Sequence, residues 1–381
     1  MKITDVRTAE LRGHGISTYV RIYTDEGVYG TGECIHGGTG AAPVVHEMAR
    51  LLAGEDPLDV ERLYETLRRR FLFNGALAGI TVTALTGVEI ALWDLAGKAL
   101  GLPVYRLLGG LFRDRIRMYC DCHAGRDDSP ESAAEKALEV IGQGFTAVKF
   151  DIDDLRHPAK QDRYNHTASN AEIDAMVRRV AAVREAIGPH VDLAIDMHGR
   201  YDTTTGIRVA RELEPFRLVW LEEPVPPENI DAMREVKQST STPICTGENL
   251  YLRWGFRDLI EKQAVDVIMP DLPKCCGIAE GRRIAAHAET YYIPMAPHNV
   301  TGPLGTLASC HCCATIPNFL LLEWHWYDRP HWHELVVVDE PLIQEGHITM
   351  PTTPGLGHEL NEDAARHYLR EGTQLFAEAP A

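Results

Sequence analysis

The 381-residue sequence contains no run of 18 apolar residues, the length that marks a candidate membrane-spanning helix. Its first residues, MKITDVRTAEL, include no apolar segment of the signal-peptide type. A basic excess is also missing, because 38 Lys and Arg stand against 55 Asp and Glu, which gives a net charge of −17. These absences argue against a membrane or nucleic acid as a partner, and we expect a cytoplasmic protein.

The cysteines form no recognisable framework. Cys275–Cys276 and Cys312–Cys313 are adjacent pairs without C-x-x-C spacing, and Cys120, Cys245 and Cys310 lie inside apolar runs. We therefore expect buried free thiols rather than a zinc site or disulfides. The sequence also has no serine or cysteine in a G-x-S-x-G setting, which argues against acyl-transfer chemistry.

The pattern of apolar residues changes along the chain. The first 34 residues alternate like a three-stranded meander, and helical segments follow. Beyond about residue 115, eight short apolar runs interleave with helices, which is typical of a TIM-type (β/α) barrel in the α/β class; a doubly wound open sheet is the alternative. The runs end near Cys122, Asp151, Asp196, Glu222, Glu248, Asp271, His298 and Glu323. We expect an N-terminal α+β capping domain at 1–114, a barrel catalytic domain at 115–345, and a C-terminal segment at 346–381 that packs back on the capping domain.

Three acidic residues, Asp196, Glu222 and Glu248, stand 26 residues apart, each at the end of an apolar run. In a parallel barrel the carboxyl ends of neighbouring strands lie side by side, so these carboxylates should converge. They would repel one another unless a cation joined them, and oxygen-only ligation suits Mg²⁺. Taken singly, each acid could equally be a turn residue or a helix N-cap.

Two histidines stand near strand ends with an acidic neighbour. His198 follows Asp196 by two residues, so an extended chain would turn both to the same side, where His198 could act as an acid or base or as a further metal ligand. Asp271 and His298 close the sixth and seventh runs, and an aspartate beside a histidine fixes its tautomer and raises its basicity. A structural histidine bonded to the backbone is the alternative for His298.

Other polar residues at strand ends are candidates for binding a substrate. Lys149 and Asp151 share one face of the second strand, where the lysine could contact a substrate carboxylate or pair with Asp151. Glu323 could bond substrate at the eighth strand. The polar insert at 152–170 follows the second strand directly and could be a lid, a specificity element or a solvated loop.

With these residues in place, the sequence resembles the enolase superfamily, in its mandelate racemase subgroup. The resemblance covers nearly the whole chain. It includes the meander, the helix motif ALWDLAGKALGLPVYRLLGG at 91–110, D-M-H at 196–198, E-E-P at 222–224, G-E-N at 247–249, the Asp271–His298 pair and Glu323. It implies Mg²⁺ on Asp196, Glu222 and Glu248, a substrate with a carboxylate, removal of the neighbouring proton to give a metal-stabilised enediolate, and a homo-oligomer.

The resemblance also separates two reaction types. Racemases of the subgroup have Lys-x-Lys at the second strand, whereas this chain reads Lys149-Phe150-Asp151. The Asp196-Met197-His198 motif instead resembles acid-sugar dehydratases such as galactonate dehydratase, in which the histidine is the general acid. We expect a carbon–oxygen lyase in which His298, oriented by Asp271, removes the C2 proton and His198 protonates the leaving hydroxyl. An aldonate such as galactonate, gluconate or mannonate would become a 2-keto-3-deoxy acid.

Substrate specificity is expected to come from loops over the barrel mouth. The segments 12–19 and 71–79 offer His14 and Asn74 to bond sugar hydroxyls. Some mannonate dehydratases use an arginine and a tyrosine of the strand-two loop, and Arg163 and Tyr164 are the candidates here. Two alternatives stay open: a racemase, epimerase or cycloisomerase with the same metal site, and a non-catalytic protein that keeps the fold.

Overall fold

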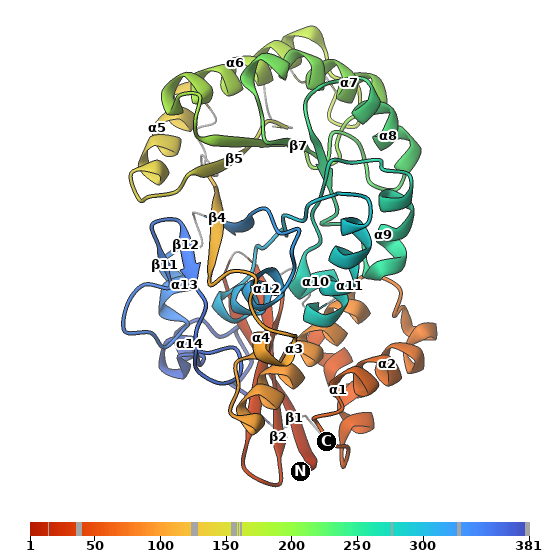
Figure 1. Ribbon diagram of the computed structural model, residues 1–381, viewed down its shortest axis with the longest axis vertical. Coiled ribbons are helices and arrows are strands. Elements are labelled where there is room, and N and C mark those ends of the chain that lie inside the picture. The colour runs from red at the N-terminus through yellow and green to blue at the C-terminus, as the bar shows by residue number, and fades with distance from the viewer. Residues whose placement is uncertain are drawn as a thin grey trace.

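The computed structural model describes all residues except 14, 36–39, 123–128, 154–157, 159, 161, 276, 326–328 and 378–381. A (β/α) barrel, with its helices on the outside, occupies the upper part of Figure 1, and an α+β unit made by the start of the chain lies below it. The expected fold class, a barrel with an N-terminal capping domain, is confirmed.

The capping unit is a three-stranded antiparallel sheet covered by helices. Its elements are β1 (Ile3–Arg12), β2 (Ile16–Thr24), β3 (Tyr29–Cys34), α1 (Ala41–Leu52), α2 (Val60–Arg70), the 3₁₀ turn η1 (Leu72–Asn74), α3 (Ile80–Leu100) and α4 (Val104–Leu107). Helix α3 can lie directly on the sheet because Gly30 and Gly32 of β3 have no side chains, and a Cβ on either would collide with the helix backbone. By length and composition α3 alone, within the described chain, could cross a membrane, but 89% of its most apolar stretch is buried in the protein. Its apolar residues are spread around the helix and not confined to one face, as is typical of a core helix.

The barrel is built from parallel strands in chain order, and the last strand returns to pair with the first. Its strands are β4 (Arg115–Asp121), β5 (Ala147–Asp151), β6 (Asp192–Asp196), β7 (Trp220–Glu222), β8 (Ile244–Thr246), β9 (Val267–Ile268) and β10 (Leu322–His325). The seventh run is reduced to single bridges from Met295 to Ile268 and Phe319. Pro294 and Pro297 flank Met295 and donate no backbone hydrogen bond, which explains why a regular strand does not form there.

Side chains fill the inside of the barrel, so that it is a packed core and not a channel. The rings of Tyr119 and Trp220 meet edge to face with centroids 5.2 Å apart, and small residues such as Ala147 and Ala194 leave room for them. The outer elements are α5 (Pro130–Ile141), α6 (Asn170–Ile187), α7 (Thr203–Glu212), the 3₁₀ turn η2 (Glu214–Phe216), α8 (Ile230–Gln238), α9 (Leu252–Glu261), α10 (Leu272–Cys275), α11 (Gly277–Glu289) and α12 (Pro303–Ala314). The eight described cysteines are buried and free, as expected.

The end of the chain returns to the capping unit and runs beside its sheet (Figure 1). Leu369 forms an antiparallel bridge with Leu11, and Arg21 forms an ion pair with Glu362 at 2.6 Å. The elements of this part are α13 (Arg329–Glu334), β11 (Ile343–Gln344), β12 (His347–Thr349), which pairs with β4, and α14 (Glu362–His367).

Two buried carboxylates of the capping unit bind the first turns of barrel helices. Glu33 accepts hydrogen bonds from the amides of Gly302 and Gly305 at the start of α12, at 2.6 and 2.9 Å. Glu89 of α3 accepts one from the amide of Ile278 in α11 at 3.0 Å, and burial raises its pKa to about 7. Helix N-termini favour negative charge, so these contacts fix the capping unit over the barrel.

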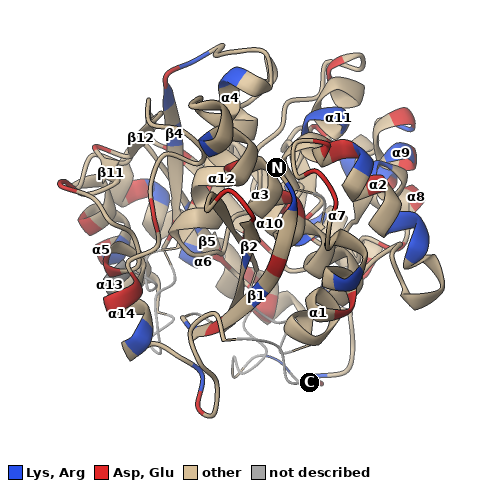
Figure 2. Cartoon of the chain, turned by 90° about the horizontal axis from the view of Figure 1, so that it is seen from below, with Lys and Arg blue, Asp and Glu red and all other residues tan. Residues whose placement is uncertain are grey.

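An ion pair joins the two units on the outside as well. Figure 2 shows acidic and basic segments interspersed over α2, α9 and α11. Arg283 of α11 pairs with Glu61 of α2 and so joins the two units. Within the barrel, Arg253 of α9 donates to Glu280 of α11 at 2.7 Å. Arg283 and Arg253 of this face are therefore paired with acidic side chains.

His311 of α12 should lower the stability of the protein as the pH falls below about 6.5. It is buried, accepts from the amide of Tyr105 at 3.1 Å through Nδ1, and contacts the carbonyl of Leu356 at 3.2 Å through Nε2. Burial lowers its pKa to about 4, against about 6.5 for an unfolded chain. Between those values the unfolded state binds more protons, so stability is present above pH 6.5 and is lost as pH falls towards 4, by about 3 kcal/mol at most.

The measurement is urea unfolding from pH 7 to pH 4 for the wild type and His311→Gln, which does not titrate in this range. We expect the free energy of unfolding to fall more steeply in the wild type than in the variant. The same dependence of the free energy of unfolding on pH in both proteins would show that His311 does not cause this loss of stability.

Candidate active site

A buried lysine lies among carboxylates at the carboxyl ends of the barrel strands. The Nζ of Lys149 is 2.8 Å from Glu323 Oε1, 3.1 Å from Asp196 Oδ2, 3.3 Å from Glu222 Oε2 and 3.8 Å from Asp121 Oδ2. Burial alone would lower the pKa of Lys149, but Glu222, Glu323 and Asp196 outweigh it and raise the pKa well above its ordinary value. Lys149 is therefore a cation that neutralises this cluster.

The three predicted metal ligands lie at or just beyond the carboxyl ends of adjacent strands. Asp196 and Glu222 are direct register partners of β6 and β7, which explains their convergence on Lys149. Glu248 lies two residues beyond β8, and its Oε2 is 2.8 Å from Nε2 of His298. Asp196 and Glu222 thus both contact the Lys149 ammonium group, whereas Glu248 contacts His298.

This donor set fits a hard divalent cation. Burial and the charge of Asp196 raise the pKa of Glu222 well above its ordinary value, so the ionised carboxylates need a positive charge between them. Lys149 meets part of that need, and the oxygen ligands suit Mg²⁺. Two groups of acidic and histidine side chains in the described chain have ligand atoms within 4.8 Å of one another, Asp151–Asp196–His198 and Asp121–Glu323–His325. Of the three predicted ligands only Asp196 belongs to either group, so the predicted set is not gathered around one point without its ion.

His298 and Asp271 form the predicted pair. Nδ1 of His298 is 2.5 Å from Asp271 Oδ2, and both side chains are buried. The opposite nitrogen, Nε2, contacts Glu248 and lies 3.7 Å from Glu323 Oε2. Burial lowers the pKa of His298, but Glu248 and Glu323 outweigh burial and raise it well above the ordinary value. The ring therefore has one nitrogen fixed by an aspartate and the other directed to the carboxylate cluster.

His198 reaches the same cluster, but by a different backbone path from the expected one. Strand β6 ends at Asp196, and His198 has a left-handed backbone with φ of 47°, so strand alternation does not place it. Its amide donates to Asp196 Oδ1 at 2.8 Å, and its ring Nε2 is 3.7 Å from Asp196 Oδ2. Burial lowers the pKa of His198, but Asp196, Asp153 and Asp151 raise it to about 11. A cationic ring here is suited to donate a proton.

Three polar residues of the site were not predicted. Asp121 ends β4 and faces Lys149, and Nε2 of His325 is 3.2 Å from Asp121 Oδ2. Asp153 contacts the ring of His198 at 3.0 Å. Alternation along β10 could have found His325, which follows Glu323 by two residues in that strand. Asp153 lies two residues beyond β5, where strand alternation no longer applies.

Some predicted substrate residues do not join the cluster. Tyr164 is 94% exposed, and Arg163 beside it is exposed too. Asn74 is exposed at the end of η1, where its carbonyl accepts a hydrogen bond from Thr81. In the described part of the chain no hydrogen bond joins these three side chains to the carboxylates, and His14 lies outside the described residues.

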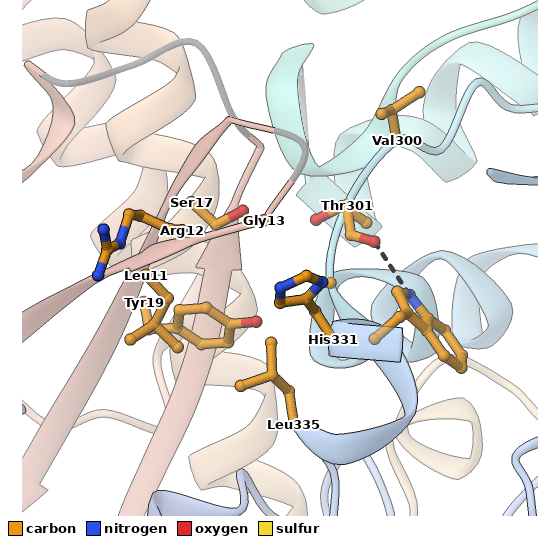
Figure 3. A pocket seen from close by; sticks show the side chains of 11 residues that line it. Leu11, Arg12, Gly13, Ser17, Tyr19, Val300, Thr301, His331 and Leu335 are labelled. Carbon is orange, nitrogen blue, oxygen red and sulfur yellow. Dashed lines mark hydrogen bonds between the residues drawn. The ribbon is translucent and has the colours of Figure 1, made fainter. Parts of the chain in front are cut away.

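A cavity lies between the capping sheet and the loop that follows His298. Figure 3 shows the His331 ring pointing between Tyr19 and Thr301, with Arg12 directed away from the cavity. Its lining residues are Leu11, Arg12, Gly13, Ser17, Tyr19, Val300, Thr301, Gly302, His331, Trp332 and Leu335. Arg12, Ser17 and Tyr19 of the predicted specificity segment therefore line a cavity together with the loop at 300–302, which starts two residues after His298.

Two family models match the chain. "Enolase C-terminal domain-like" matches residues 132–364, and "Mandelate racemase / muconate lactonizing enzyme, N-terminal domain" matches residues 11–109. Among curated relatives, a D-xylonate dehydratase from Haloferax volcanii is 46% identical over 378 residues, which cover 99% of this chain and 91% of the relative. A D-galactonate dehydratase from Xanthomonas oryzae pv. oryzae is 33% identical over 370 residues, 95% of this chain and 93% of the relative.

Solved structures show the same similarity. A mandelate racemase/muconate lactonizing enzyme-like protein from Rubrobacter xylanophilus has a TM-score of 0.95 at 50% identity, and the match covers 99% of both chains. The 3,6-anhydro-D-galactonate cycloisomerase from Zobellia galactanivorans has a TM-score of 0.86 at 30% identity, covering 97% of this chain and all of that one.

Proposed function

The chain belongs to the mandelate racemase/muconate lactonizing enzyme family of the enolase superfamily, and from this membership we propose that it is a Mg²⁺-dependent aldonate dehydratase. The membership confirms the resemblance inferred from the sequence. The names of the xylonate and galactonate relatives support the expected hydro-lyase activity. One observation carries the proposal: two histidines, each with Nδ1 held by an aspartate, turn Nε2 towards one carboxylate cluster.

Asp196, Glu222 and Glu248 would hold the metal ion. Members of the superfamily bind a divalent metal, and these three carboxylates offer the oxygen ligands that Mg²⁺ prefers. When bound, the ion would supply positive charge that offsets the negative charge of its three carboxylate ligands. It would also stabilise the negative charge that develops on the substrate carboxylate during the reaction. Lys149 lies beside this site and would donate a hydrogen bond to an oxygen of the substrate carboxylate. Glu323, which Lys149 keeps ionised, would accept a hydrogen bond from a substrate hydroxyl.

His298 is the proposed base. Its Nε2 would take the proton from C2 of the aldonate, and the C2–H electron pair would move into the enediolate. Asp271, 2.5 Å from Nδ1, holds the ring in the tautomer with its proton on Nδ1. Burial lowers the pKa of His298, whereas Glu248 raises it in the metal-free protein. A cation that takes up the Glu248 carboxylate would remove the effect of Glu248 and leave Nε2 able to accept a proton. A positioned base of this kind is typically worth about 10²–10⁴-fold in rate.

His198 is the proposed acid. Its Nε2 proton would pass to the C3 hydroxyl as the C3–O bond breaks, so that the hydroxyl leaves as water. The enol that remains then tautomerises to the 2-keto-3-deoxy acid. The raised pKa of about 11 is consistent with a ring that starts the reaction as a cation.

Asp151 occupies the position at which racemases of the subgroup have their second lysine. Protonation of both faces of C2 needs two opposed bases. The second strand of this chain offers Lys149 and Asp151 in place of two lysines. A cycloisomerase needs only one base, and the neighbour from Zobellia galactanivorans makes it the second candidate. Loss of water separates the two candidates, because a cycloisomerase product is isomeric with its substrate.

We expect Mg²⁺-dependent formation of a 2-keto-3-deoxy acid from at least one aldonate, with D-xylonate the first to test because of the 46% identical relative. The assay is a panel of five- and six-carbon aldonates and aldarates with Mg²⁺, read by keto-acid detection and mass. The same panel with a chelator is the control. A product of unchanged mass would contradict dehydration and favour the cycloisomerase or an epimerase.

A further inference from the structure

The insert after β5 begins with a buried acid that contacts the proposed general acid. Asp153 is two residues beyond β5, and its Oδ1 is 3.0 Å from Nδ1 of His198. Its other oxygen, Oδ2, is 2.5 Å from Nε of Arg200. Both oxygens of Asp153 therefore bind the loop between β6 and α7, which carries His198.

The contact repeats the arrangement of the proposed base. Asp271 binds Nδ1 of His298 and leaves Nε2 facing Glu248, and Asp153 binds Nδ1 of His198 and leaves Nε2 facing Asp196. An aspartate that accepts a hydrogen bond from Nδ1 fixes the orientation of an imidazole and keeps Nε2 turned to the opposite side. Each histidine thus has an aspartate from a different segment behind it.

Among the described residues, the other ion-pair contact of the His198 ring is that of Nε2 with Asp196 Oδ2, at 3.7 Å. Its side chain is 35% exposed, and its left-handed backbone is fixed by the bond from its amide to Asp196 Oδ1. That bond leaves rotation of the ring about the Cα–Cβ bond free. The bond to Asp153 restricts this rotation and keeps Nε2 on the side of the cluster.

The far end of the insert binds the same loop. His166 Nδ1 contacts the carbonyl of Arg200 at 3.0 Å, and the amide of Asp202 donates to the carbonyl of His166 at 3.0 Å. The amide of Ala168 donates to Thr205 Oγ1 at 3.0 Å. Contacts at both ends of the insert therefore surround the loop that carries His198.

We propose that Asp153 is a positioning residue for His198. This inference rests on the proposed dehydration, because it concerns departure of the C3 hydroxyl and not removal of the C2 proton. In Asp153→Asn the side chain can turn either its oxygen or its nitrogen to Nδ1, so the ring is no longer held in one state.

The test is Asp153→Asn in D₂O with an aldonate that the wild type converts. We expect kcat for dehydration to fall about 10²-fold while KM changes little. Removal of the C2 proton should continue, so that recovered substrate contains deuterium at C2. Dehydration at the wild-type rate would overturn the proposal, and so would an equal loss of dehydration and exchange, since that pattern indicates general damage.

Asp162→Asn is the matched control, because Asp162 is an exposed acid of the same insert that binds only the amide of Tyr164 among the described contacts. It should leave both rates unchanged. A second readout is the ¹⁵N shift of His198 Nδ1, assigned by comparison with His198→Asn. Asp153→Asn should change this shift, and an unchanged shift would overturn the positioning role. If no aldonate is converted but the shift changes, the proposed function fails and the positioning role stands.

Discussion

His298→Asn should abolish exchange of the C2 proton and lower dehydration by about 10³-fold. The asparagine cannot take up a proton, and Nε2 of His298 is the histidine nitrogen that faces both Glu248 and Glu323. Asp271 would keep its place but would have no ring to orient. The measurement is deuterium incorporation at C2 of recovered substrate, together with the rate of keto-acid formation.

The variant should still bind Mg²⁺, because the loss of His298 releases the Glu248 carboxylate that now contacts it. Titration calorimetry with Mg²⁺ thus separates loss of the base from loss of the metal site. His287→Asn is the matched control, since His287 lies on α11 beside Glu261, away from the cluster, and should change neither rate. Exchange that persists at the wild-type rate in His298→Asn would show that another group removes the proton.

The part of the site that lies on regular strands could be predicted from the sequence. Asp196 and Glu222 end neighbouring parallel strands, and the register of such strands brings their last residues together. The Asp271–His298 contact was predicted for a similar reason, although Asp271 lies three residues beyond β9 and His298 follows a run that forms only single bridges. Its prediction depended on chain order around the barrel, which was correct.

The sequence could not predict contacts that depend on loop conformation or on reach across the barrel. The direction of the Glu248 carboxylate is set in a turn after β8, where alternation no longer applies. His198 occupies a left-handed position that only the folded loop explains. Lys149 was expected to meet Asp151 or a substrate, but its long side chain reaches Glu222 and Glu323, which are 73 and 174 residues away in sequence.

Because Lys149 contacts three buried carboxylates, its replacement should lower the stability of the metal-free protein strongly. Lys149→Met keeps the length of the side chain and removes its charge. Asp196, Glu222 and Glu323 would then share a buried space without their central cation. Breaking a buried ion pair from one side typically costs about 3–5 kcal/mol, so we expect a clearly lower unfolding midpoint in the presence of a chelator.

Mg²⁺ should restore much of this loss. An ion bound to Asp196 and Glu222 replaces positive charge that Lys149→Met lacks, so it should raise the unfolding midpoint of the variant more than that of the wild type. Thermal unfolding with chelator and with Mg²⁺ measures both effects without reference to any substrate. Lys262→Met is the control, because Lys262 forms an exposed pair with Asp231, and such pairs contribute about 0–1 kcal/mol. Equal Mg²⁺ effects on the wild type and Lys149→Met would mean that the ion and the lysine do not neutralise the same carboxylates.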